Sequence, residues 1–310
     1  MKIAFTSCTR YEAFKEQKEW DHIYDEDPDY LFLLGDNIYM DYGIWPFTKE
    51  YIRAPKKYSL EKFSSLMRQK YINQFENVPS FKRLVDKMRA KNGFFATWDD
   101  HDFAWNNANG ANVSDEKKEV SRSLFHEYTQ CSTNLPHVYY HVDTPLARVI
   151  FIDNRFDAER PGKTNQLISD AQFQFIEEKL NHDLPYTLFC GGISLTLSSE
   201  NWSKYPQQLQ KFCQLIEHKK KVLFLAGDVH YNAFVPPKKI HKLNCKTPPQ
   251  LISSGMQINL LGLDIELDNR HNWAILEIEE NRSHITFYGK NKKQEKKSKK
   301  ANEWMQQHFF

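Results

Sequence analysis

Short apolar runs rich in β-branched and aromatic residues recur along this chain of 310 residues, and most of them end in polar residues or glycine. Runs of this length are typical of buried β-strands. Between them lie segments in which apolar residues recur at spacings of three and four, the period of an amphipathic helix. Strands that alternate with helices predict the α/β class.

The predicted strands cover residues 2–8, 30–36, 93–100, 148–154, 186–192, 221–228 and 250–256. The predicted helices cover residues 12–24, 60–75, 80–91, 115–130, 169–181 and 206–218. Two further strands, 273–280 and 283–289, flank Asn281 and Arg282 and predict a hairpin.

The chain has no internal repeat, no linker rich in Pro, Gly or Ser, and no mid-chain break in composition. We therefore expect one domain over residues 1–289, with a helical insertion at about 43–92, and a separate tail over 290–310. Residues 290–300 contain seven lysines and one glutamate. A mobile, solvated tail is the favoured interpretation, and contact with a polyanion is the alternative.

Composition excludes several classes of protein. With 40% hydrophobic residues the chain can bury a core, which excludes intrinsic disorder. Its apolar runs are shorter than the roughly 18–20 residues of a membrane span. Five scattered cysteines form no CxxC pair, and the start MKIAFTSC has no secretory pattern. We therefore expect a cytoplasmic protein without a membrane span, whose oligomeric state the sequence does not indicate.

Titratable side chains gather where the predicted strands end. They occur in Ser7-Cys8, Gly35-Asp36-Asn37, Asp99–Asp102, Asp153–Arg155 and Gly227–His230. In an open α/β sheet such ends share one edge, where ligands bind. A single Asp after a strand is usually a cap or a turn residue. So many carboxylates at one edge would repel one another without cations, and the pattern therefore predicts bound metal ions.

Five motifs occur in a characteristic order: FLLGDNIYMD (32–41), FATWDDHDFAWNN (95–107), FIDNR (151–155), NWSKYPQQLQKF (201–212) and LAGDVH (225–230). In these motifs the chain resembles the PhoD-like alkaline phosphatases, a branch of the calcineurin-like metallophosphoesterases. The resemblance implies a four-layer α/β/β/α sandwich with mixed sheets, a multinuclear metal centre and hydrolysis of phosphate esters.

The resemblance also implies the metal ligands. Asp36 matches the family's bridging carboxylate, Tyr39 its phenolate ligand and Cys8 its thiolate ligand. The further ligands that it implies are Asp100, Asp228 and His230. Phenolate and thiolate together favour Fe³⁺ at one site. Oxygen-rich surroundings favour Ca²⁺ beside it, and spacing alone does not separate Ca²⁺ from Mn²⁺ or Mg²⁺.

Three residues are candidates for catalysis. With a metal-bound hydroxide as the nucleophile, His101 fits a phosphate-contacting residue or general acid, and its alternative role is only to orient Asp100. Arg155 fits a residue whose guanidinium contacts the phosphate, and its alternative role is a structural ion pair with Asp153. Asn107 would help to orient one of these groups.

Two departures from the family pattern stand out. Cys190-Gly191-Gly192 follows the fifth strand where many members carry polar residues, and the chain begins at its first catalytic strand. The predicted function is a metal-dependent phosphomonoesterase or phosphodiesterase. One alternative is a narrow phosphodiesterase acting on a nucleotide, a nucleic-acid end or a phospholipid. The other is a non-catalytic phosphate-binding module, which the complete residue set disfavours.

Overall fold

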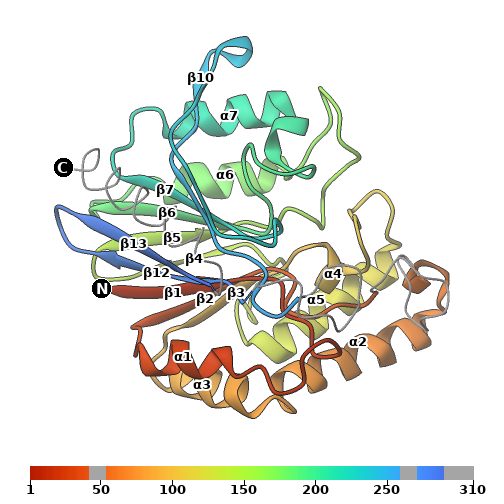
Figure 1. The fold of residues 1–310 in the computed structure, drawn as a ribbon. Coiled ribbons are helices and arrows are strands. Elements are labelled where there is room, and N and C mark those ends of the chain that lie inside the picture. Colours follow the sequence, from red (N-terminus) through yellow and green to blue (C-terminus); the bar gives the residue numbers. More distant parts are fainter. Residues whose placement is uncertain (42–53, 259–270, 290–310) are drawn as a thin grey trace.

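A computed structural model describes residues 1–41, 54–258 and 271–289. Two β-sheets pack face to face in the centre, and helices cover the outer face of each, which makes four layers (Figure 1). The predicted α/β/β/α sandwich with mixed sheets is thus confirmed. The tail 290–310 and the first part of the expected insertion, 43–53, lie outside the described residues.

The first sheet has the order β13-β12-β1-β2-β3. Strands β1 (Lys2–Thr6), β2 (Tyr30–Leu34) and β3 (Phe94–Thr97) are parallel. The antiparallel hairpin of β12 (Trp273–Ile278) and β13 (Ser283–Tyr288) joins them through β1. Because β1, β2 and β3 run the same way, the residues that follow them meet at one edge of the sheet.

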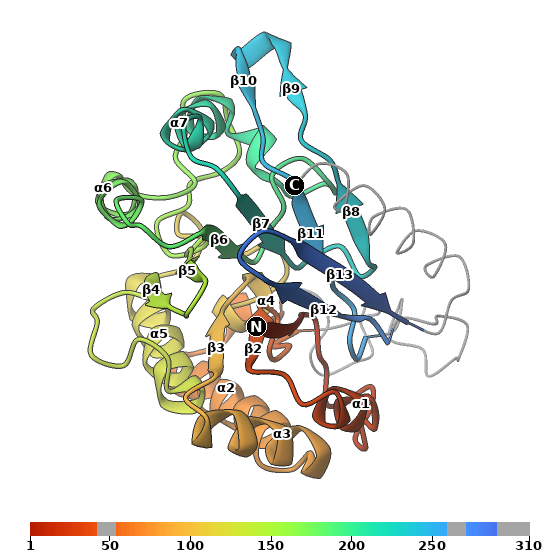
Figure 2. The same ribbon diagram turned by 90° about the vertical axis from the view of Figure 1, so that its left-hand side faces the viewer.

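The second sheet has the order β4-β5-β6-β7-β11-β8. Its four central strands are parallel: β5 (Ala147–Phe151), β6 (Tyr186–Gly191), β7 (Val222–Ala226) and β11 (Gln250–Ile252). The edge strands β4 (Tyr140–Asp143) and β8 (Ala233–Val235) are antiparallel. A short ribbon of β9 (Lys239–Ile240) and β10 (Cys245–Lys246) extends beyond this sheet (Figure 2).

Helices α6 (Asp170–Lys179) and α7 (Pro206–Ile216) cover the second sheet (Figures 1 and 2). Helices on the side of the first sheet are α1 (Glu19–Asp25), α2 (Leu60–Phe75), α3 (Pro79–Ala90) and α5 (Asp115–Thr129). Short 3-10 turns lie at Ala54–Lys57, Trp202–Lys204 and His241–Leu243. No helix in the described part of the chain is both long enough and apolar enough to cross a bilayer.

Aromatic side chains fill the space between the layers. Phe32 of the first sheet meets Phe151 of the second edge to face, with ring centroids 5.3 Å apart. On the far side of the second sheet, Phe189 and Phe224 pack against Phe212 of α7. Burying each such side chain contributes about 1.5–3 kcal/mol. These contacts fix the two sheets against each other and so position the residues at their edges.

The predicted strands and the C-terminal hairpin are confirmed, but the helix expected at 12–24 is wrong in its first half. Helix α1 begins only at Glu19. Gln17, just before it, has a left-handed φ of 45°, which interrupts a helix. Its buried side chain accepts a hydrogen bond from Trp20 and pairs with Gln74. These contacts with the core outweigh the local helical pattern.

Candidate metal centre

Strained backbone marks the edge where the parallel strands end. Outside glycine, a φ near +60° is uncommon, costs of order 1–3 kcal/mol and concentrates at functional sites. Of the nine site residues predicted from the sequence, these have such a φ: Cys8 (60°), Asp36 (51°), Asn107 (60°), Asp228 (66°) and His230 (59°). The fold therefore holds these positions in conformations that local preferences disfavour.

Glycines let the two sheets approach each other beside this edge. A Cβ atom on Gly192 would lie 2.6 Å from the Asp99 carboxyl carbon, and one on Gly227 would lie 2.4 Å from the Leu34 carbonyl oxygen. Such distances are closer than atoms can pack. The Gly191-Gly192 pair, which departs from the family pattern, thus has a structural cause at Gly192, because a larger residue there would displace Asp99.

One group of possible metal ligands combines sulfur, oxygen and nitrogen. The ligand atoms of Cys8, Asp36 and His230 all lie within 4.8 Å of one another. Cys8 Sγ is 3.3 Å from Asp36 Oδ2. The Tyr39 hydroxyl donates to the same Asp36 oxygen at 3.0 Å and lies 3.4 Å from His230 Nε2. The structure thus brings these four predicted ligands together at the ends of β1, β2 and β7.

A second group shares Asp36 with the first. Ligand atoms of Asp36, Asp100 and His101 also lie within 4.8 Å of one another. The backbone N–H of His101 donates to Asp36 Oδ1 at 3.2 Å, so the two Asp36 oxygens face different groups. A carboxylate in this position can contact two cations, one from each oxygen. The geometry agrees with the bridging role that the family resemblance implies for Asp36.

Asp228 lies beside these groups but belongs to neither of them among the described residues. Its Oδ2 accepts a hydrogen bond from Ser198 Oγ at 2.9 Å. Burial, and then the nearby Asp100 carboxylate, raises the pKa of Asp228 to about 7. Because the Asp100 carboxylate raises the pKa of Asp228, the two carboxylates are close enough to interact electrostatically. Asp228 therefore lies on the side of the second group.

The electrostatics of the site call for cations. Burial, and then the Asp100 carboxylate, raises the pKa of Asp36 well above its usual range. Burial and the Asp36 carboxylate likewise raise the pKa of Cys8 and of Tyr39. Such groups retain their protons unless a positive charge replaces them, and bound cations reverse this balance. The carboxylate, thiol, phenol and imidazole donors therefore fit metal ions.

His101 is held by a carboxylate, Asp41, that is not among the site residues predicted from the sequence. His101 Nδ1 lies 2.8 Å from Oδ1 of Asp41, and the backbone N–H of Asn106 reaches both Asp41 oxygens at 3.0 Å. Burial acts to lower the pKa of His101, but the carboxylates of Asp100, Asp36 and Asp41 outweigh it and raise this pKa to about 10. The available signal was a second aspartate in GDNIYMD, five residues after Asp36.

Replacement of Asp41 by Asn is expected to lower turnover about 10–100-fold, the usual effect of removing a group that orients a site residue. A carboxylate beside imidazolium favours its protonated form, so the pKa of His101 should fall. If protonated His101 is required, the alkaline limb of the pH–rate profile then moves to lower pH. Asp170→Asn, an exposed change at the start of α6, serves as the control. An unmoved alkaline limb would contradict this role for Asp41.

Arg155 is buried and fully engaged. Its Nε donates to Asp99, its Nη1 to the Ala108 carbonyl at 3.2 Å, and its Nη2 to Glu200 at 2.8 Å. The side chain is 6% exposed, and Nη2 lies 3.8 Å from Asp100 Oδ1. Arg155 thus borders the second group, and its partner Glu200 is not among the residues predicted from the sequence.

The alternative of an ion pair between Arg155 and Asp153 does not describe this arrangement. Asp153 Oδ1 instead accepts hydrogen bonds from Trp98 Nε1 at 2.7 Å and from the backbone N–H of Arg155 at 2.9 Å. Asp153 therefore shapes the turn after β5, and the guanidinium pairs with Asp99 and Glu200.

Asn107 and Asp102 fix the loops around the site. The backbone N–H of Asn107 donates to Asp100 Oδ2, whereas the sequence predicted that Asn107 orients His101 or Arg155. Asp102 accepts hydrogen bonds from the backbone N–H groups of Asn37 and Asp99, at 3.0 and 2.6 Å. Asp99 and Asp102 form a capping box at the start of α4 (Asp100–Phe103), a short helix absent from the expected elements.

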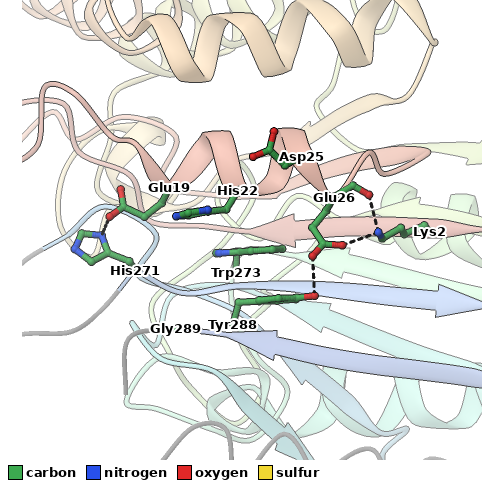
Figure 3. Close-up of a pocket in the computed structure, with 9 residues that line it drawn as sticks. All are labelled: Lys2, Glu19, His22, Asp25, Glu26, His271, Trp273, Tyr288 and Gly289. Carbon is green, nitrogen blue, oxygen red and sulfur yellow. Dashed lines mark hydrogen bonds and ion pairs between the residues drawn. The ribbon is translucent and has the colours of Figure 1, made fainter. Parts of the chain in front are cut away.

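A cavity of about 560 Å³ lies beside α1 and the β12–β13 hairpin (Figure 3). The rings of Trp273 and Tyr288 stack in it with centroids 3.7 Å apart, and Glu26 accepts hydrogen bonds from Lys2 and Tyr288. None of the predicted site residues lines this cavity. It is therefore separate from the candidate metal centre.

Three known structures with a similar architecture are those of PhoD, a dimetal phosphatase and a purple acid phosphatase. A structure of PhoD is 18% identical, with a TM-score of 0.61, and the match covers 94% of this chain and 71% of that one. A dimetal phosphatase from Danio rerio is 11% identical, with a TM-score of 0.56 and coverage of 93% and 96%. A purple acid phosphatase from yellow lupin (Lupinus luteus) seeds is 13% identical, with a TM-score of 0.51 and coverage of 93% and 51%. The fold is that of the metallophosphoesterase-like phosphatases.

A sequence match to a known family covers part of the chain. The family model described as PhoD-like phosphatase matches residues 3–140, which include Cys8, Asp36 and Asp100. Over these residues the chain is similar to the PhoD-like phosphatases, which supports the predicted class of hydrolases acting on phosphoric esters. A search of curated proteins found no match.

Proposed function

We propose that this protein hydrolyses phosphate esters at a centre of two or more metal ions. The observation that carries the proposal is the position of Asp36, whose side chain is shared by two groups of buried ligand atoms. Cys8, Tyr39 and His230 would hold one ion with Asp36, and Asp100 and Asp228 would hold the other. Such ions neutralise charge on the phosphoryl oxygens and activate a water molecule.

The remaining side chains handle the phosphoryl group and the leaving oxygen. Because Asp41 holds Nδ1 of His101, Nε2 is the nitrogen left to protonate or hydrogen-bond the leaving oxygen. Arg155 supplies positive charge beside Asp100 and would contact the phosphoryl group through Nη2 if Glu200 gave way. Asn107 would keep Asp100 in its orientation through the backbone N–H.

The proposal is tested with the purified, metal-loaded protein and two p-nitrophenyl phosphates, one a monoester and one a diester. We expect release of nitrophenol that chelation abolishes and added metal restores. Cleavage of only the diester would favour the narrow phosphodiesterase. Binding of inorganic phosphate without hydrolysis of either ester would contradict catalysis and favour a non-catalytic phosphate-binding module.

Iron is expected in the first ligand group, because the Tyr39 phenol and the Cys8 thiol both lie within hydrogen-bond distance of Asp36. Fe³⁺ accepts both donors once they are deprotonated, and Ca²⁺, Mn²⁺ or Mg²⁺ would suit the carboxylate-rich second group. Phenolate-to-iron charge transfer should then colour the protein, and Tyr39→Phe should remove the absorption band. Elemental analysis and a visible spectrum of protein prepared without chelator check this. Absence of both iron and the band would contradict it.

A further inference from the structure

A small polar cavity adjoins the candidate metal centre and contains part of the NWSKYP motif, to which the proposed chemistry gives no role. Its volume is about 50 Å³. The lining includes Asn154, Arg155, Glu200, Asn201, Lys204 and Tyr205. Three of these residues come from the motif, Asn154 and Arg155 follow β5, and Glu200 immediately precedes the motif.

Asn154 is the unexplained group in this cavity. Its side chain amide is buried, with the residue 1% exposed, and neither Nδ2 nor Oδ1 has a hydrogen-bond partner among the described residues. Leaving a buried polar group unsatisfied costs about 1–3 kcal/mol, so such groups normally have a partner. A Cβ atom on Gly191 would lie 2.9 Å from Asn154 Oδ1, so the glycine leaves room for the amide. The amide is therefore positioned to bind something that enters the cavity.

The cavity is next to the place where a phosphoryl group would bind. Arg155 lines it and also lies 3.8 Å from Asp100 through Nη2. The adjacent loop carries Ser198, which donates to Asp228, and Glu200, which pairs with Arg155. An ester bound at the metal centre could therefore place its organic part in this cavity.

The chemistry of the lining favours a hydroxyl group. A carboxamide has both donors and an acceptor, and a hydroxyl satisfies both kinds of atom because it donates and accepts at once. The charge of Arg155 is opposed by Asp99 and Glu200, so Arg155 does not require an anion in the cavity. The volume of the cavity, about 50 Å³, suits a small organic group.

We propose that this cavity is a substrate subsite in which Asn154 recognises a hydroxyl on a small organic group of the phosphate ester. The inference rests on the proposed function and adds a substrate class to it. Esters of small hydroxylated alcohols are then preferred over esters of alkyl alcohols of equal size. Asn154 thus selects between substrates by contacting the organic part of the ester.

The test compares 2-hydroxyethyl phosphate with propyl phosphate, which differ only in a hydroxyl against a methyl group. We expect the metal-loaded protein to show a kcat/KM about tenfold higher for the hydroxylated ester, the value of one good hydrogen bond. Asn154→Leu, close in size but apolar, should bring this ratio near one. Asn154→Ser, which leaves room and a hydroxyl, should also lower it and serves if the Leu variant does not fold. Asn181→Leu, an exposed change after α6, should leave the ratio as it is.

The outcomes separate this inference from the proposed function. A ratio near one in the unchanged protein would mean that the cavity holds water only and would overturn the inference. A ratio that both Asn154 variants retain would overturn it as well, as would cleavage of p-nitrophenyl phosphate with neither alkyl ester accepted. Failure to cleave any ester, with metal bound, would instead count against the proposed function itself.

Discussion

Asp36→Asn is expected to abolish turnover while the fold is retained. The amide nearly preserves the volume of the side chain, but it presents one oxygen where the carboxylate presents two. Those two oxygens now meet different ligand groups, one beside Cys8 and Tyr39 and the other beside His101. Without a shared anionic ligand two cations would repel each other, and the variant should bind fewer metal ions per chain.

The melting temperature in chelator shows whether the Asp36→Asn variant has lost its bridging carboxylate alone or its fold as well. The raised pKa of Asp36 means that its charged form is disfavoured in the folded chain, so this group lowers stability as pH rises towards its folded pKa. A neutral Asn removes that effect, and the melting temperature in chelator should not fall. Asp115→Asn, an exposed change in α5, is the matched control. Hydrolysis by the Asp36 variant near the parent rate would show that Asp36 is not the bridge.

His101→Ala should reduce turnover about 10²–10⁴-fold, the usual effect of removing a general acid. Metal content should fall much less, because Asp100 and Asp36 remain to hold the second ion. The alternative is that His101 supports metal binding. The structure is compatible with this role, because a ring nitrogen of His101 lies within 4.8 Å of carboxylate oxygens of Asp36 and Asp100. A residue that only supports the ligands typically costs about 10–100-fold in affinity or activity.

Kinetics at increasing metal concentration distinguish these two roles for His101. If added metal restores the rate of the variant, His101 supports metal binding and the acid role fails. If the rate stays low at saturating metal, the histidine acts on the phosphoryl group or the leaving oxygen. His218→Ala, an exposed change after α7, controls for histidine loss as such.

Patterns within single segments predicted most of this architecture. An apolar run predicts each parallel strand, and a titratable residue follows the end of the run. Asp36 follows β2 in this way, and Asp228 follows β7. The site residues that were not predicted are those whose roles depend on tertiary contacts. Asp41 and Glu200 gain their roles from His101 and Arg155, which lie 60 and 45 positions away. Spacing within one segment can single out such a residue, as the second aspartate of GDNIYMD does, but it does not indicate which distant side chain the residue contacts.

The left-handed backbone at Cys8, Asp36, Asp228 and His230 implies a conflict between durability and activity. Glycine or asparagine adopts this conformation more easily than cysteine or histidine does. A library selected only for resistance to heat should therefore enrich Gly or Asn at these four positions and lose its metal. Selection for stability alone would therefore act against positions that the proposed chemistry requires.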